Sequence, residues 1–265
     1  MFIVFDIETG PLSDTVLRTM LPPLKPEEPL GAFDPTSVRI GNLVNQQKIQ
    51  QKLDREEAKH RQEVEKQKQR MATAADDHFA NFKSRSALRA EHGRVMAIGR
   101  QSGDERTKEH LLQAYGDDLD FESEEQMDRA ESMLLVSFWE LAVLSSLEGI
   151  TLAGHNINRF DLPFLVRRSW ILDVPVPPEV RNGRYWSSVF VDTLDEWQLG
   201  DRSVQDCGLD SLCRATGGPC KPADVKGDDF ARLYLGTESE RMEALAYLDN
   251  DLAMTMHMAE TVQLV

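Results

Sequence analysis

The sequence contains few cysteines. Only Cys207, Cys213 and Cys220 occur among 265 residues, and no two of them form a Cys-x-x-Cys pair. Neither a disulfide framework nor a zinc knuckle is therefore expected. This cysteine usage fits a reducing compartment, and we expect the protein to be cytoplasmic.

Long apolar runs are missing as well. The longest candidate, residues 133–139, contains Ser137 and ends at Glu140, whereas a membrane span needs roughly 20 apolar residues. The apolar start of the chain has no basic segment and reaches Asp6 too early for a signal peptide. We therefore expect no membrane association.

Positive charge is scarce. Thirty basic residues stand against 45 acidic ones, so the formal net charge is −15. Such a chain is poorly suited to hold nucleic acid by its overall electrostatic field. The charge is uneven, however, because residues 48–70 include eight basic and five acidic residues and carry a local charge of +3. Acidic residues in a metal site would also be neutralised by bound cations.

What is present indicates one layered α/β domain covering residues 1–265. Hydrophobic residues make up 41% of the chain and charged residues 28%, an ordinary globular balance. Short β-rich apolar runs predict five strands, at residues 2–5, 93–99, 110–115, 151–155 and 189–191. Helical periodicity predicts helices at residues 122–147, after the fourth strand through Phe164, Leu165 and Trp170, and at 194–199, 206–216, 228–235 and 239–262.

An insertion at about residues 21–92 interrupts this pattern. Five prolines between residues 21 and 35 predict an irregular loop. Residues 45–72 contain no glycine or proline and predict a helix, but their apolar positions are too sparse for a core helix. We interpret this charged helix as a solvated spacer. The alternative is that it guides a substrate or contacts a partner.

Asp6 and Glu8 stand two positions apart at the predicted end of the first strand. Side chains at positions i and i+2 of a strand share one face, so the two carboxylates should lie side by side. They would repel each other unless a hard divalent cation such as Mg²⁺ or Mn²⁺ bound between them. The alternative is an ordinary solvated strand end.

Two further acidic segments follow. Asp161 comes just after the fourth predicted strand, where a helix N-cap is the alternative interpretation. Tyr247 and Asp251 are four residues apart on the last predicted helix, so they share one face. Asp249 is a rival acid, but it lies on a different face of that helix.

These segments, in this order, resemble the DEDD superfamily of 3′-to-5′ exonucleases. The first motif matches residues 5–10, Phe-Asp-Ile-Glu-Thr-Gly, and the second matches Asn156 followed by Phe160-Asp161. The third matches the tyrosine subclass through Tyr247 and Asp251. The histidine subclass would require histidine where this chain has Ala246.

The resemblance implies a ribonuclease H-like fold with a central mixed five-stranded sheet flanked by helices. The chain looks most like a stand-alone form of the proofreading exonuclease domain of family-B DNA polymerases. Its implied activity is removal of nucleoside 5′-monophosphates from the 3′ end of DNA, preferably single-stranded. We expect no polymerase domain in 265 residues, so a separate polymerase or repair protein is the expected partner.

The resemblance also implies roles for individual residues. Two Mg²⁺ or Mn²⁺ ions would be held by four carboxylates, with Asp6 bridging both ions, and Tyr247 would orient the attacking water. The implied ligands are Asp6, Glu8, Asp161 and Asp251. The implied substrate-binding residues are Thr9, Gly10, Asn156 and Phe160.

The sequence leaves two other functions open: an RNA exonuclease on the same scaffold, and a catalytically silent nucleic-acid-binding module. A silent module would be indicated by a lost carboxylate, and all four are present. Three arginines near the second motif are candidates for holding the substrate, namely Arg159, Arg167 and Arg168. Other polar or soft side chains are interpreted as structural, namely His155, Asp192, His257 and the methionines around it.

Overall fold

The computed structural model describes residues 1–41, 44–182, 185–201, 203–204, 206–221 and 227–264. Two compact units make up the chain. The first consists of Met1–Leu17 and Arg85–Val265, and the second consists of Arg18–Ser84. Each unit is described by itself.

A five-stranded sheet in the order β3-β2-β1-β4-β7 forms the centre of the first unit. β1 pairs antiparallel with β2 and parallel with β4, so the sheet is mixed. Its strands are β1 (Phe2–Pro11), β2 (Gly93–Ser102), β3 (Glu105–His110), β4 (Thr151–Gly154) and β7 (Phe190–Asp192). The expected mixed α/β architecture is confirmed, and it is compatible with a ribonuclease H-like fold. β5 (Arg181–Asn182) and β6 (Tyr185–Trp186) form a separate two-stranded sheet.

The third strand was predicted at the wrong place. Residues 110–115 do not form a strand, because the structure ends β3 at His110 and begins helix α3 (Leu111–Tyr115) at the next residue. The His110 side chain accepts a hydrogen bond from the backbone N–H of Gln113 and so caps that helix. β3 lies at the edge of the sheet and has no fully buried residue. It therefore lacks the apolar alternation by which strands are recognised.

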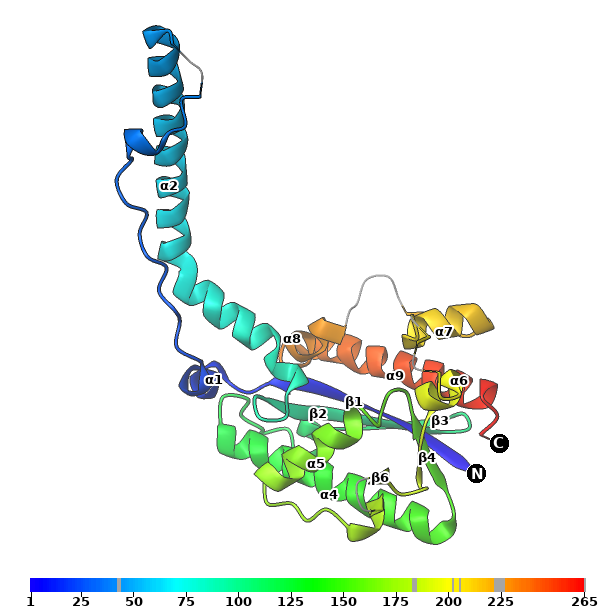
Figure 1. Cartoon of the computed structure of the whole chain (residues 1–265). Helices are drawn as coiled ribbons and strands as arrows, with labels where there is room; N and C mark the ends of the chain where they lie inside the picture. Colours follow the sequence, from blue (N-terminus) through cyan, green and yellow to red (C-terminus); the bar gives the residue numbers. More distant parts are fainter. Residues whose placement is uncertain (42–43, 183–184, 202, 205, 222–226, 265) are drawn as a thin grey trace. The chain divides into compact units, whose positions relative to one another are not determined.

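Helices cover both faces of the sheet (Figure 1). α4 and α5 lie on one face, and α8 and α9 lie on the other. The helices are α1 (Asp14–Met20), α2 (Gln46–Ser84), α4 (Glu124–Glu148), α5 (Asp161–Ile171), α6 (Thr193–Gln198), α7 (Leu209–Thr216), α8 (Phe230–Tyr234) and α9 (Glu238–Thr261). Short 3-10 turns occupy Pro35–Ser37, Ser86–Leu88, Pro178–Val180 and Gly227–Asp229.

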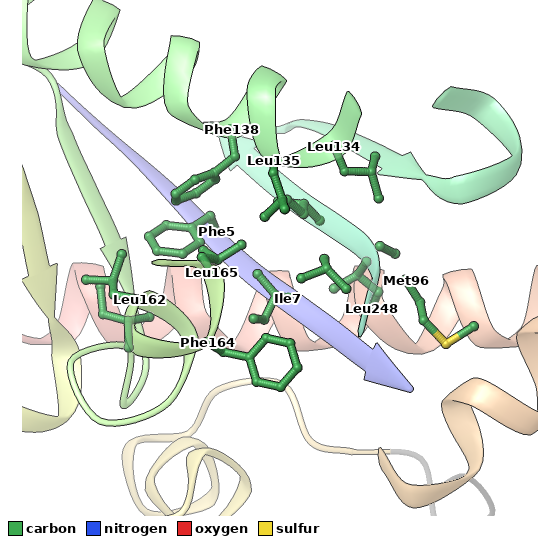
Figure 2. Packing of buried hydrophobic residues seen from close by; sticks show 14 of the residues in the cluster. Phe5, Ile7, Met96, Leu134, Leu135, Phe138, Leu162, Phe164, Leu165 and Leu248 are labelled. Atoms are coloured by element: carbon green, nitrogen blue, oxygen red, sulfur yellow. The ribbon is translucent and has the colours of Figure 1, made fainter. Parts of the chain in front are cut away.

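The main core extends over both faces of the sheet, and one part of it lies between the sheet and α4 with α5. Phe5 of β1 meets Phe138 of α4 with ring centroids 5.1 Å apart, and Figure 2 shows Leu135 and Leu165 beside this pair. Burying large apolar side chains of this kind stabilises the fold by about 1.5–3 kcal/mol each. Because Phe5 and Ile7 are buried in this core, the alternation of side chains along β1 directs Asp6 and Glu8 to the opposite face of the sheet.

Helix α4 is long and apolar enough, by length and composition alone, to cross a membrane. Its most apolar 18-residue window has a mean hydropathy of 1.4, and 44% of that window is buried inside the protein. The core helix of a soluble protein passes the same test. Since α4 packs on the sheet, its length and apolar composition are only weak evidence for membrane insertion.

A buried ion pair joins α4 to α5. Arg168 donates two hydrogen bonds to Glu131, from Nε to Oε1 at 2.9 Å and from NH2 to Oε2 at 2.7 Å. Glu131 Oε1 also accepts the backbone N–H of Val95 in β2 at 2.8 Å. Because Arg168 is only 2% exposed, the prediction that it could hold the substrate is wrong. It is a structural residue that ties α5 to α4 and β2.

The second unit contains the charged helix α2, and it continues twelve residues beyond the predicted end at residue 72. The proline-rich segment before it runs along one face of the helix. Buried Gln67 accepts the backbone N–H of Leu30 at 2.7 Å and donates to the carbonyl of Glu28 at 2.8 Å. His60 Nε2 lies 2.9 Å from the carbonyl oxygen of Gly31. These contacts give a helix with few apolar residues a defined packing face.

Candidate active site

Asp6 and Glu8 of β1 face helix α9, on the opposite side of the strand from Phe5 and Ile7. Each offers a carboxylate oxygen that lies within 4.8 Å of the other and of an oxygen of Asp251. Residues almost 250 positions apart in the sequence are thereby brought together. Glu8 is the last residue before a bulge, where the pairing of β1 with β2 shifts register.

A glycine allows α9 to approach the sheet this closely. Gly99 of β2 is the register partner of Asp6, and a Cβ atom there would come within 2.8 Å of Leu252 and 3.0 Å of Leu248. Contacts under 3.0 Å between a Cβ and its surroundings force a rearrangement. The missing side chain at Gly99 therefore sets the separation between the acidic strand and the helix that carries Tyr247 and Asp251.

Lys221 was not predicted, and it lies directly at the site. Its ammonium donates a hydrogen bond to the Tyr247 hydroxyl and another to Asp251 Oδ2, the latter at 2.9 Å. The Lys221 nitrogen also lies 4.6 Å from the centroid of the Tyr247 ring. No periodic pattern marks this lysine. The only signal in the sequence is a single basic residue within the turn-rich segment 217–222.

Asp161 stands beside this cluster. It is the first residue of α5 and is only 3% exposed, and the N-cap position belongs to Phe160. The alternative interpretation of Asp161 as the N-cap is therefore wrong by one residue. Its charge is the largest electrostatic contribution that raises the pKa of Asp6, after desolvation by burial. The structure thus brings Asp161 near Asp6, although only Asp6, Glu8 and Asp251 meet within 4.8 Å.

The electrostatics of the site fit a bound cation. Burial, followed by repulsion from neighbouring carboxylates, raises the pKa values of Asp6 and Glu8 well above their ordinary range. Burial likewise raises the pKa of Asp161 to about 7 and increases that of Asp251. Within the part of the chain that the structure describes, buried Asp251 Oδ1 has no hydrogen-bond partner. Clustered oxygen ligands and one unsatisfied carboxylate oxygen suit a hard divalent ion.

The raised pKa of Asp161 predicts a pH-dependent stability difference in metal-free buffer. Between pH 4 and pH 7 the folded protein binds more protons at this carboxyl than the unfolded chain does, so wild-type stability falls as the pH rises. Asp161→Asn removes that charge and should be more stable than the wild type at pH 8. The advantage should vanish near pH 3.5, where the unfolded carboxyl is also protonated.

Denaturant unfolding at several pH values, with EDTA present, measures this difference. The exposed Asp117 provides the control, since Asp117→Asn should leave stability nearly unchanged across the same range. An advantage of Asp161→Asn that was equal at pH 3.5 and pH 8 would contradict the assignment.

Asp192 braces the loop that leads to Asp161. It caps α6 as expected, accepting the backbone N–H of Leu194 at 3.0 Å. Its two oxygens also accept the backbone N–H groups of Asn156 at 2.7 Å and Asn158 at 2.9 Å. Asn156 has a left-handed backbone with φ of 63°. This second role of Asp192 was missed because its partners lie more than 30 residues earlier in the chain.

The four expected substrate-binding residues lie in different settings. The Thr9 hydroxyl donates to the carbonyl of Ala87 at 2.8 Å. Gly10 is buried, and a Cβ there would come within 2.2 Å of the Met96 sulfur, so its lack of a side chain serves packing. Half-buried Phe160 contacts Phe164, with ring centroids 5.6 Å apart. Substrate contact by these residues and by Asn156 stays a prediction.

Other side chains near the site are structural. His155 lies 3.0 Å from the Thr193 hydroxyl and 2.9 Å from the carbonyl of Cys207. His257 lies 2.9 Å from the Thr216 hydroxyl. The buried Met254 and Met258 pack in a small second core with Leu212 and Cys213. Of the remaining candidate arginines, Arg159 pairs with Asp195 at 2.8 Å and Arg167 is exposed.

No protein-family model matches the sequence, and a search of curated proteins finds no relative. Among solved structures, the chain is similar to the family B DNA polymerase from the hyperthermophilic archaeon Pyrobaculum calidifontis, with 17% sequence identity and a TM-score of 0.49. The similarity covers 68% of this chain and 23% of the polymerase chain, so it spans less than a quarter of that protein. At this sequence identity and TM-score the similarity does not assign a function to the chain.

Proposed function

We propose that the protein is a metal-dependent 3′-to-5′ exonuclease that acts on the 3′ end of DNA, preferably single-stranded, and releases nucleoside 5′-monophosphates. One observation carries the proposal: Asp6 and Glu8 of the first motif meet Asp251 of the third beneath α9, where Lys221 bonds both Tyr247 and Asp251, and Asp161 of the second motif stands close enough to raise the pKa of Asp6. Their order and spacing in the sequence resemble the DEDD exonucleases. The convergence gives that resemblance a physical basis.

Four carboxylates would hold the divalent ions, namely those of Asp6, Glu8, Asp161 and Asp251. Two such ions, Mg²⁺ or Mn²⁺, supply an activated water and stabilise the departing 3′-oxygen when they are bound. The carboxylates are positioned by rigid elements, because β1 carries Asp6 and Glu8 while α9 carries Asp251. Burial, and next the repulsion from neighbouring carboxylates, raises the pKa values of Asp6 and Glu8, and bound cations would relieve that repulsion.

Tyr247 acts in this proposal by orienting the attacking water. Burial, with a further contribution from the charge of Asp251, raises the pKa of its hydroxyl to about 12. A phenol with such a pKa stays protonated near neutral pH and is a poor general base. Lys221 donates to the same hydroxyl and to Asp251, so it fixes the position of both side chains and places a positive charge beside the reacting phosphate.

Tyr247→Phe should slow hydrolysis by about 10-fold to 100-fold without abolishing it, in the range typical of a lost positioning or proton-transfer contact. The ring would still fill its site, so folding should be unaffected. Single-turnover rates on a 5′-labelled oligonucleotide measure the effect. Tyr185→Phe, at an exposed tyrosine, is the matched control and should keep the wild-type rate. A complete loss with Tyr247→Phe would instead assign the hydroxyl an essential chemical step.

The proposal is tested by timed digestion of end-labelled DNA and RNA oligonucleotides with Mg²⁺, Mn²⁺ or EDTA. Products that shorten one nucleotide at a time from the 3′ end of DNA, only with a divalent ion, are expected. Faster digestion of RNA would replace DNA by RNA as the substrate. No hydrolysis of either with any ion would overturn the proposal in favour of a binding module.

A further inference from the structure

The second unit carries the opposite charge to the first. Residues 18–84 include twelve basic and ten acidic side chains, a net charge of +2, whereas the rest of the chain carries −17. An acidic catalytic unit repels a polyanion except where cations are bound. The location of the basic residues on the second unit therefore decides whether it can offer a surface to nucleic acid.

Six basic side chains of α2 form one continuous stripe along the helix. At 3.6 residues per turn they fall within about 60° of the helix circumference, and no acidic residue of 46–70 shares that sector. The stripe covers 23 residues, and its two ends are 22 residue steps apart, or about 33 Å at 1.5 Å per residue. We define this basic stripe as Lys48, Lys52, Arg55, Lys59, Lys66 and Arg70.

Most of the basic stripe lies away from the face on which α2 packs, although Lys52 and Arg70 reach the preceding segment at Arg39 and Glu27. That packing face contains His60, Val64 and Gln67, which contact the proline-rich segment. Five of the six stripe residues are exposed, and the exception is Lys52, whose ammonium donates to the carbonyl of Arg39 at 2.6 Å. The stripe is therefore exposed to a partner at every residue except Lys52.

Three stripe residues have no ion-pair partner among the described residues: Lys48, Arg55 and Lys66. Lys59 pairs with Glu56 at 2.7 Å and Arg70 with Glu27 at 3.2 Å. Ion pairs between exposed side chains are weak, so a phosphate can replace the carboxylate at little cost. The stripe thus presents a row of cations that the protein itself leaves largely unneutralised.

We propose that the basic stripe of α2 binds the sugar-phosphate backbone of a nucleic acid strand. A linear row of positive charges about 33 Å long complements a linear polyanion, and each phosphate contact releases condensed counterions. The interaction reads no sequence, because lysine and arginine contacts to phosphate carry no base information. This binding concerns α2 alone and does not depend on hydrolysis at the acidic site.

The test compares two triple variants with the same change in charge. The stripe variant is Lys48→Gln, Arg55→Gln and Lys66→Gln, and the control, at exposed residues off the stripe, is Lys25→Gln, Arg61→Gln and Lys68→Gln. Glutamine keeps high helix propensity, and circular dichroism checks that α2 is retained. Binding of a labelled single-stranded 20-nucleotide DNA is measured in EDTA from about 50 to 200 mM salt.

The stripe variant should bind at least about tenfold more weakly at the lowest salt, and its salt slope should be shallower by about 2, since each single-strand phosphate contact contributes about 0.7. The control should remain near the wild type. Equal losses in both triple variants, unchanged binding in the stripe variant, or no wild-type binding at about 50 mM salt would each overturn the proposal.

Hydrolysis separates this inference from the proposed function. The p-nitrophenyl ester of thymidine 5′-monophosphate offers a single nucleotide and cannot engage a row of cations. Both triple variants should therefore hydrolyse it with Mn²⁺ at the wild-type rate. Loss of DNA binding with retained hydrolysis in the stripe variant supports the binding role of the basic stripe. DNA binding without any hydrolysis by the wild type would refute only the proposed exonuclease activity.

Discussion

Replacing Asp6 by asparagine is expected to abolish metal-dependent hydrolysis, lowering the rate by about 1,000-fold or more. The charge of Asp6 interacts with those of Asp161, Asp251 and Glu8, and the resemblance to the DEDD exonucleases implies that Asp6 would contact both ions. Asparagine keeps the size of the side chain but removes the negative charge that a divalent ion requires. Single-turnover hydrolysis of a 5′-labelled oligonucleotide measures the loss.

The same variant should become more stable in metal-free buffer. Desolvation and repulsion by Asp161 and Asp251 outweigh the attraction of Lys221, so the ionised form of Asp6 is unfavourable in the folded protein. Thermal unfolding in EDTA should therefore occur at a higher temperature in Asp6→Asn. Added Mn²⁺ should raise the melting temperature of the wild type more than that of the variant, since an ion that binds only the native state stabilises it.

Asp249→Asn is the matched control. This acid lies on the same helix as Asp251 but forms an ion pair with Lys108, so its loss should change the hydrolysis rate less than about threefold. Wild-type turnover by Asp6→Asn, or equal losses in the two variants, would contradict the two-metal interpretation of the cluster.

The acidic residues were predictable because their positions depend on local geometry. Alternation along β1 places Asp6 and Glu8 on one face, and helical spacing aligns Tyr247 with Asp251. Their convergence was expected only through the resemblance to a known family. The separation of β1 and α9 depends on Gly99, whose effect is visible only when the packing of Leu248 and Leu252 is known.

The remaining features depend on contacts that no periodicity records. Lys221 lies in a loop, so nothing in its surroundings in the sequence marks its bonds to Tyr247 and Asp251. β3 is a polar edge strand, whereas the apolar residues 111–115 that resemble a strand form a capped helix. Arg168 was a candidate substrate contact because it lies near the second motif, but its partner Glu131 comes from another helix 37 residues earlier.

That buried pair carries the largest expected effect on stability. Arg168→Leu should lower the free energy of unfolding by about 3–5 kcal/mol, because Glu131 would be left buried without its charge partner. Glu131 is 0% exposed, and the remaining hydrogen bond from Val95 cannot replace the two from Arg168. Denaturant unfolding at pH 7 measures the loss. Arg167→Leu, at the exposed neighbour on the same helix, should change stability by less than about 1 kcal/mol.

A double variant distinguishes an uncompensated charge from lost packing. Glu131→Met combined with Arg168→Leu removes both charges and keeps similar volume, and such replacements of buried ion pairs are often neutral or stabilising. The double variant should therefore recover most of the stability that Arg168→Leu loses, although the backbone N–H of Val95 then lacks its acceptor. Because α5 begins at Asp161, the single variant should also weaken Mn²⁺ binding at the acidic site. A double variant no more stable than Arg168→Leu would show that shape, and not charge, makes this pair necessary.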